Sequence, residues 1–168
     1  GWLSYTLSKT ERKINGVSAE EKINFGDWYL SNYDKPHDIT FVGTYDLTKR
    51  LSVGMSFIYS TGRPITTPEG SYALLNGLET PLANYRSRNN GRISDYHRLD
   101  LSATLEGKHK KGRRWEGSWN FSIYNVYARR NAYSWSFQED EDNPTQLRVS
   151  QLSILGTILP SVTYNFKF

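Results

Sequence analysis

The sequence predicts an all-β fold, an antiparallel meander of about six strands. Six segments alternate apolar and polar residues with a period of two, which is typical of strands with unlike faces. Aromatic residues make up 14% of the 168 residues, yet the mean hydropathy is −0.66, which fits sheets with one apolar and one wet face. No apolar run reaches the roughly 18 residues of a transmembrane helix, so that class is excluded.

The first three strands are expected at about residues 1–10, 38–47 and 51–61. In the first, the apolar positions are Leu3, Tyr5 and Leu7. In the second, they are Ile39, Phe41, Gly43, Tyr45 and Leu47. In the third, they are Leu51, Val53, Met55, Phe57 and Tyr59. The intervening positions are mostly Ser, Thr and Gly, so each segment has one apolar side.

The last three strands are expected at about residues 96–107, 115–126 and 152–168. In the fourth, the apolar positions are Leu99, Leu101, Ala103 and Leu105. In the fifth, they are Trp115, Gly117, Trp119, Phe121 and Ile123. In the sixth, they include Val162, Tyr164, Phe166 and Phe168, with Leu155 and Leu159 interrupting the polar parity. Each segment is long enough for a tilted strand that crosses a bilayer.

Short and long connections alternate along the chain. The short ones are residues 47–50 and the basic run KHKKGRR, Lys108 to Arg114, while the long ones are about 11–37, 62–95 and 127–151. This order places every long loop at one end of the sheet. Compact soluble domains rarely carry three structureless connections of that length, whereas outer-membrane barrels have short periplasmic turns and long extracellular loops. Within the first loop, SAEEKI, Ser18 to Ile23, has a capping-box pattern for one or two helical turns.

Residue distribution decides between a second sheet and lipid over the apolar side. Aliphatic residues dominate the middles of the strands. Aromatic residues lie at or near the strand ends, namely Trp2, Tyr45, Tyr59, Trp115, Tyr127, Phe166 and Phe168. Aromatic girdles around an aliphatic band are typical of membrane barrels. The other parity carries Arg98, Asp100, Glu116, Asn120, Asn165 and Lys167, which indicates water. We therefore expect a barrel wall with lipid outside and an aqueous lumen inside.

Six strands are too few to close a membrane barrel, because single-chain barrels have at least about eight. Unpaired edges in lipid cost several kcal/mol for each polar group. The edge strands are therefore expected to pair with strands from the rest of the barrel, whether in a separate chain or another portion of the same one, or from further copies of this chain.

Several stretches together resemble the C-terminal part of a Bacteroidetes-type TonB-dependent outer-membrane receptor. They occur in family order: GWLSYTLSKTERK, NYDKPHDITFVGTYDL, STGRPITTP, RNNGRISDYHRLDLSATL, WNFSIYNVYARRNAYSW and ILPSVTYNFKF. The resemblance implies a barrel of about 22 strands around an N-terminal plug, which imports a nutrient with energy from TonB. The plug and the TonB box are not in this chain. In the family, the last strand closes against the first.

The resemblance also implies a location and partners. The location is the outer membrane of a Gram-negative cell, with the C-terminus on the periplasmic side. The partners are outer-membrane lipid, the remaining barrel strands and plug, the TonB complex through that plug, and the barrel-assembly machinery, and the resemblance leaves open a surface lipoprotein lid. The machinery would recognise the terminal aromatics Tyr164, Phe166 and Phe168, whose alternative role is packing against lipid.

Long loops on a rigid scaffold are where ligand contacts are expected. Aromatic faces stack on sugars or macrocycles, and Arg forks grip carboxylate or phosphate. The candidate ligand-binding residues are Trp28, Tyr29, Tyr33, Tyr72, Tyr85, Arg86, Arg88 and Arg92. Their alternative role is packing between loops. Asn125 and Arg130 are expected to be structural, satisfying backbone groups where the fifth strand ends.

Other clusters favour no enzyme, metal site or cofactor. There is no Cys, and His37, His97 and His109 lack ligand spacing. The acidic run QEDEDNP, Gln138 to Pro144, offers oxygens to Ca²⁺ but lacks EF-hand spacing, so a solvated hairpin tip is preferred. The basic run suits nucleic acid or anionic lipid, although a solvated turn is the simpler interpretation. No nucleic-acid partner is predicted.

Three functions remain after the sequence is read. The first is the wall of an active importer whose outer loops help to capture the ligand. The second is a soluble, secreted β-sandwich that binds carbohydrate through aromatic loops. The third is an outer-membrane adhesin or enzyme barrel. The cargo stays open among peptide, siderophore, glycan and cobalamin.

Overall fold

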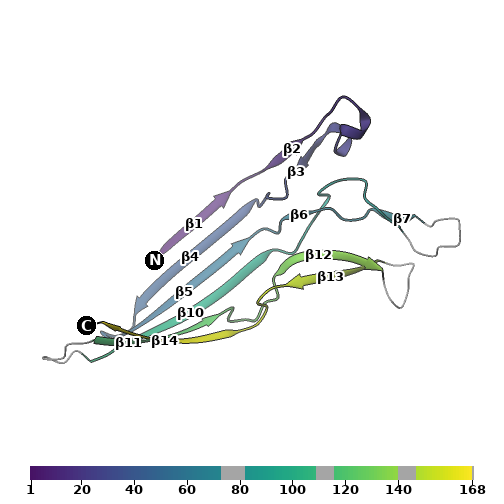
Figure 1. Ribbon diagram of the computed structural model, residues 1–168. Coiled ribbons are helices and arrows are strands. Elements are labelled where there is room, and N and C mark those ends of the chain that lie inside the picture. Colours follow the sequence, from purple (N-terminus) through teal and green to yellow (C-terminus); the bar gives the residue numbers. More distant parts are fainter. Residues whose placement is uncertain (73–81, 109–115, 140–146, 168) are drawn as a thin grey trace.

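A single antiparallel sheet dominates the computed structural model, which describes residues 1–72, 82–108, 116–139 and 147–167. Six strands pair in chain order as a meander (Figure 1). They are β1 (Trp2–Leu7), β4 (His37–Asp46), β5 (Leu51–Ser60), β10 (Tyr96–Glu106), β11 (Glu116–Tyr124) and β14 (Leu159–Lys167). The predicted all-β fold and antiparallel six-stranded sheet are therefore confirmed.

The register brings the apolar positions of all six strands onto one side of the sheet. Leu3 lies opposite Phe41, Phe41 opposite Phe57, and Phe57 opposite Leu99. Further along, Ala103 lies opposite Phe121, and Phe121 opposite Val162. Because side chains alternate across a strand, this register produces one continuous apolar face. A shift of one residue in any strand would place its apolar side chains on the opposite face.

All three long connections leave the same end of the sheet. We call them the first (8–36), second (61–95) and third (125–158) excursions. The opposite end, here called the turn end, carries residues 47–50, the end of β10 and the end of β14 (Figure 1). The predicted alternation of short and long connections is thus present.

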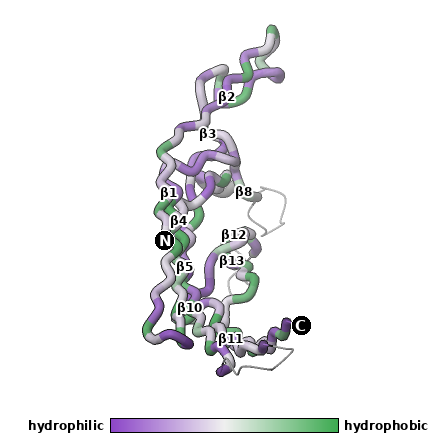
Figure 2. Tube along the Cα trace, turned by 90° about the vertical axis from the view of Figure 1, so that its left-hand side faces the viewer, coloured by the Kyte–Doolittle hydropathy of each residue, from purple (hydrophilic) through white to green (hydrophobic). Residues whose placement is uncertain are grey.

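Short hairpins extend from the sheet, so the prediction of structureless loops is wrong. The first excursion holds β2 (Glu11–Lys13) and β3 (Trp28–Leu30), and the third holds β12 (Ala132–Glu139) and β13 (Leu147–Ser153). The second contains β6 (Pro64–Ile65) paired with β9 (Gly91–Arg92), and β7 (Gly70–Tyr72) paired with β8 (Leu82–Asn84). In Figure 2, the β2–β3 hairpin projects beyond the sheet and the β12–β13 hairpin lies to one side of it.

The predicted strand at 152–168 is wrong in its first half. Residues 152 and 153 belong to β13, and residues 154–158 form no strand before β14 begins at Leu159. Leu155 has a φ of 53°, in the left-handed region, which ends the extended conformation.

The capping-box segment does form a turn, a 3₁₀-helix η1 (Ala19–Glu21), where the Glu21 carboxylate accepts the Val17 N–H at 2.9 Å. A second 3₁₀ turn, η2, spans Asn24–Gly26.

The sheet is open at both edges within the described residues. β1 pairs only with β4, and β14 only with β11. Every residue of both edge strands is exposed. No helix in the described part of the chain has the length and apolarity needed to span a membrane.

Candidate functional site

The six-stranded sheet presents one continuous apolar face. Its side chains belong to one parity of the six strands: Leu3, Tyr5, Leu7, Ile39, Phe41, Tyr45, Leu51, Val53, Met55, Phe57, Tyr59, Leu99, Leu101, Ala103, Leu105, Trp119, Phe121, Ile123, Val162, Tyr164 and Phe166. None of them is buried. Phe121 is 46% exposed, Leu101 39% and Val162 59%. Among the described residues, no second sheet covers this face.

Aromatic side chains gather at both ends of the apolar face. At the turn end, the Trp119 ring lies 4.7 Å from Tyr164 and 6.4 Å from Phe121, and Tyr164 stacks on Phe166 at 6.3 Å. At the other end, two Tyr–His pairs occur.

Both Tyr–His pairs are hydrogen-bonded. The Tyr5 hydroxyl lies 2.9 Å from His37 Nδ1, and the Tyr127 hydroxyl lies 2.7 Å from His97 Nδ1. Burial raises the pKa of Tyr127.

At the usual rise per residue, the strand from His37 to Tyr45 spans about 27 Å, or about 20 Å when tilted as in a barrel. This separation of the aromatic ends is close to the roughly 25 Å apolar band of membrane barrels.

The polar face carries an ion pair on β10. Arg98 forms an ion pair with Asp100 at 2.9 Å and donates to the hydroxyls of Tyr96 and Tyr124. Its guanidinium also lies 4.1 Å from the centroid of the Tyr124 ring. This network keeps the charge of Arg98 satisfied near the loop end of β10.

A buried ion pair joins the first two excursions. Asp34 is 0% exposed and receives the Thr10 N–H at 2.6 Å and a short bond from Arg92. Arg92 donates further to the carbonyls of Asp34 and Gly62 at 3.1 and 2.9 Å. Burial alone would raise the pKa of Asp34, but the hydrogen bonds from Arg92 and Thr10 and the nearby positive charges lower it overall.

Asp95 organises the junction between β5 and the second excursion. It accepts the Gly62 N–H at 2.9 Å and the Tyr59 hydroxyl at 2.7 Å. These two bonds, the Gly62 amide first, lower the pKa of Asp95. Position 62 requires glycine, because a Cβ there would lie 1.8 Å from the Ile93 carbonyl oxygen.

Asn125 closes the third excursion at the end of β11. It is almost fully buried, and its amide donates to the carbonyls of Arg129, Leu155 and Thr157. Asn125 therefore satisfies backbone groups, as predicted. Arg130 was expected to satisfy backbone groups through its side chain. The side chain of Arg129 does this instead, because it donates to the Asp95 carbonyl at 3.1 Å. Arg130 takes part through its carbonyl, which accepts the Gln151 amide at 3.0 Å.

These contacts make the described parts of the three excursions one hydrogen-bonded body, which we call the loop network. The stretches STGRP, NNGRISD and NVYARRN supply Gly62, Arg92, Asp95, Asn125 and Arg129. Residues far apart in sequence thus meet at one end of the sheet. The pairing of Arg92 with Asp34 carried no local sequence signal, because 58 positions separate the two residues.

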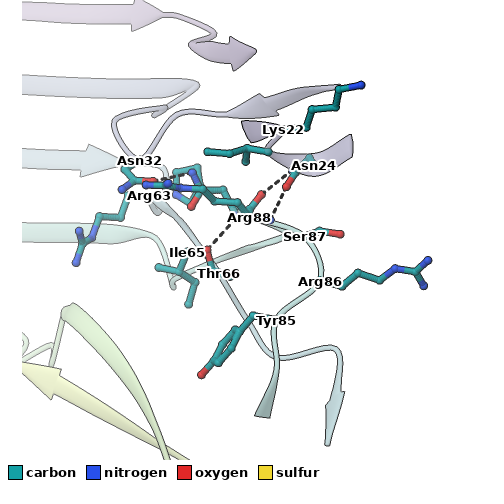
Figure 3. A pocket seen from close by; sticks show the side chains of 13 residues that line it. Lys22, Asn24, Asn32, Arg63, Ile65, Thr66, Tyr85, Arg86, Ser87 and Arg88 are labelled. Carbon is teal, nitrogen blue, oxygen red and sulfur yellow. Dashed lines mark hydrogen bonds between the residues drawn. The ribbon is translucent and has the colours of Figure 1, made fainter. Parts of the chain in front are cut away.

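A polar groove of about 600 Å³ lies between the first two excursions (Figure 3). Four of its lining residues are cations: Lys22, Arg63, Arg86 and Arg88. The other lining residues are neutral, with amides, hydroxyls and the Tyr85 ring among them. Lys22 and Arg86 extend outward in different directions in Figure 3, so the charges surround the groove without converging on one point. Such a lining suits a ligand with many hydroxyl or anionic groups.

The candidate ligand-binding residues fall into four groups. Tyr85, Arg86 and Arg88 line the groove, where Arg88 exchanges hydrogen bonds with Asn24 and Arg86 lies 5.8 Å from the Phe25 ring. Trp28 and Tyr33 are exposed outside the groove, while Tyr29 is buried and Arg92 belongs to the loop network. The side chain of Tyr72 lies outside the described residues. The sequence missed Lys22 and Arg63, whose only signal was a positive charge in a long loop.

The remaining predicted sites are placed as follows. Tyr164 and Phe166 lie on the exposed apolar face, and Phe168 lies outside the described residues, as do His109 and most of the basic and acidic runs. Within the described residues, no group of three or more His, Asp or Glu side chains is arranged to hold a metal ion.

The chain was compared with known proteins at three levels. No family model, curated protein or solved structure matches it.

Proposed function

We propose that this chain forms part of the wall of an outer-membrane β-barrel that imports a nutrient. The observation that carries the proposal is the continuous apolar face with exposed side chains, bounded at both ends by aromatic residues. In water, such a contiguous exposed apolar surface would favour association or aggregation. Against acyl chains, the same surface is stabilising.

The burial pattern supports lipid over a second protein layer. Among the described residues, the buried apolar side chains are Tyr29, Pro64 and Ile93, and all three lie in the excursions. A soluble sandwich would bury the apolar side of this sheet under another sheet. The carbohydrate-binding sandwich is thus the weaker alternative.

The long loops and the resemblance to TonB-dependent receptors support import as the function of this wall. The long excursions lie at one end of the sheet, and the polar groove opens between two of them. In the proposed barrel of about 22 strands, the excursions face outward and contribute to ligand capture. The open edges of β1 and β14 pair with neighbouring barrel strands, and the C-terminal aromatics face the periplasmic side. TonB acts through a plug supplied by the rest of the protein.

Two substitutions of adjacent residues on opposite faces test the lipid assignment. In the full-length protein, Phe121→Arg should reduce folded, membrane-inserted protein, since Arg on the lipid face costs up to about 2–4 kcal/mol, the most at the midplane and less toward either interface. Ser122→Arg faces the polar side and should fold nearly as the parent does. Heat-modifiable gel migration and urea titration of purified outer membranes measure both. Equal effects of the two variants, or a parent protein that stays in the aqueous fraction without detergent, would contradict the proposal.

A further inference from the structure

The turn end of the sheet holds a second recess, which the import proposal leaves unused. It has a volume of about 770 Å³ and lies among the turn 47–50 and the ends of β10, β11 and β14. Its described cations are Lys49, Arg50, Lys108 and Lys167, which outnumber the acids Glu106 and Glu116. We call it the basic crevice.

Backbone contacts hold Arg50 and the turn that carries Lys49. The Arg50 Nε donates to the Glu106 carbonyl at 2.8 Å, and the Glu106 N–H donates to the Arg50 carbonyl at 2.7 Å. Thr48 Oγ1 accepts the Leu51 N–H at 3.0 Å, which tightens the turn that presents Lys49. The crevice is therefore attached to the sheet through two neighbouring strands.

The crevice is continuous with the aromatic end of the apolar face. Trp119, Tyr164 and Phe166 line both. The hydroxyl of Tyr164 reaches Gly117, where a Cβ would lie 2.2 Å from it, so the polar tip of the ring is directed toward the turn end. An apolar ring with its hydroxyl toward water is the arrangement of side chains at a membrane interface.

We propose that the basic crevice binds the phosphate headgroup of an anionic phospholipid, whose acyl chains lie along Trp119 and the apolar face. Cations beside an aromatic girdle are placed where headgroup phosphates lie, and each cation near a charged bilayer surface strengthens binding. Lipid is favoured over nucleic acid because the crevice opens directly onto the apolar face. Further Lys and Arg residues follow Lys108 in the sequence, but they are not part of the proposed site, which consists of the lining residues of the basic crevice. The inference rests on the proposed function.

Native mass spectrometry of the full-length, detergent-purified protein tests this assignment. The probes are micelles containing phosphatidylglycerol or phosphatidylethanolamine. The parent should retain phosphatidylglycerol at least about tenfold better, and Lys49→Gln with Lys108→Gln should remove most of that preference, since each cation contributes roughly fivefold. The matched control, Lys22→Gln with Arg86→Gln, removes two exposed cations at the loop end and should keep the preference.

Three results would overturn the inference: equal retention of the two lipids by the parent, an undiminished preference in the Lys49 and Lys108 variant, or displacement of the lipid by millimolar inorganic phosphate or by an oligonucleotide. Membrane insertion is scored separately. A protein that does not enter the membrane refutes the proposed function, whereas one that inserts without lipid preference refutes only the headgroup site.

Discussion

Replacing Arg92 by Met should open the loop network locally while leaving the sheet intact. The substitution removes the guanidinium that serves the Asp34 carboxylate and the carbonyls of Asp34 and Gly62, and it keeps much of the aliphatic stem. Asp34 is then left fully buried with the Thr10 N–H as its remaining described partner.

The expected loss can be worked from burial. Removing one partner of a buried ion pair costs about 3–5 kcal/mol. The Arg92 side chain is 29% exposed, so water screens part of the pair and we expect about 2–3 kcal/mol. That loss corresponds to an approximately 30- to 150-fold increase in the population of the locally open state.

Hydrogen–deuterium exchange of the full-length protein measures this opening directly. Exchange should accelerate at the amides of Thr10, Ser31 and Asp34, which are hydrogen-bonded within the network. Arg86→Met, an exposed Arg of the second excursion, is the matched control and should change these rates less than about twofold. Adding Asp34→Asn to the Arg92 variant should restore part of the protection, because it removes the unpaired buried charge. Unchanged rates in the Arg92 variant, or equal effects of the two Arg variants, would refute the argument.

Two further predictions concern the same network. Asp34 and Asp95 have lowered pKa values, so their contribution to stability is fully present at neutral pH and is lost as the pH falls below the ordinary value of 3.8. Amide exchange, corrected for its intrinsic pH dependence, should therefore show constant protection from about pH 7 to 5 and a decline only below about pH 4; a decline near pH 6 would contradict this assignment. Gly62→Ala should displace the Ile93 carbonyl, since the new Cβ would lie 1.8 Å from its oxygen. Amide exchange at Gly62 and Ile93 should therefore increase. Exchange at the parental rates would contradict the conclusion that position 62 requires glycine.

Period-two patterning predicted the sheet well because strand parity is a local property. Phe121 and Val162 fall on one side simply from their positions within alternating segments, and the register then brings them together. The strand at 116–124 was expected within two residues of its bounds for the same reason. Which medium covers the apolar face was inferred from residue types, and that inference remains the proposal tested with Phe121.

Features that depend on contacts between distant segments escaped the sequence. Pairs such as β6 with β9 span two residues each, too short for a periodic signal. The end of the strand pattern near Leu155 depends on its positive φ and on the Asn125 amide that binds its carbonyl. Arg92 was a candidate for ligand binding because it lies in a loop, and nothing near it in sequence indicated Asp34 as a partner.

The loop network has a consequence for how a ligand in the polar groove would act. Side-chain contacts link neighbouring excursions as Asn24–Arg88, Asp34–Arg92 and Arg63–Tyr133. Arg63 lines the groove and also donates to the third excursion, so a ligand that orders Arg63 also restrains a segment it does not touch. Excursions joined in this way respond as one body, because displacing one would leave hydrogen-bonding groups of the others unpaired. Ligand capture at the groove should therefore slow amide exchange in all three excursions together. Protection confined to the first two would mean that the Arg63 contact is too weak to transmit the restraint.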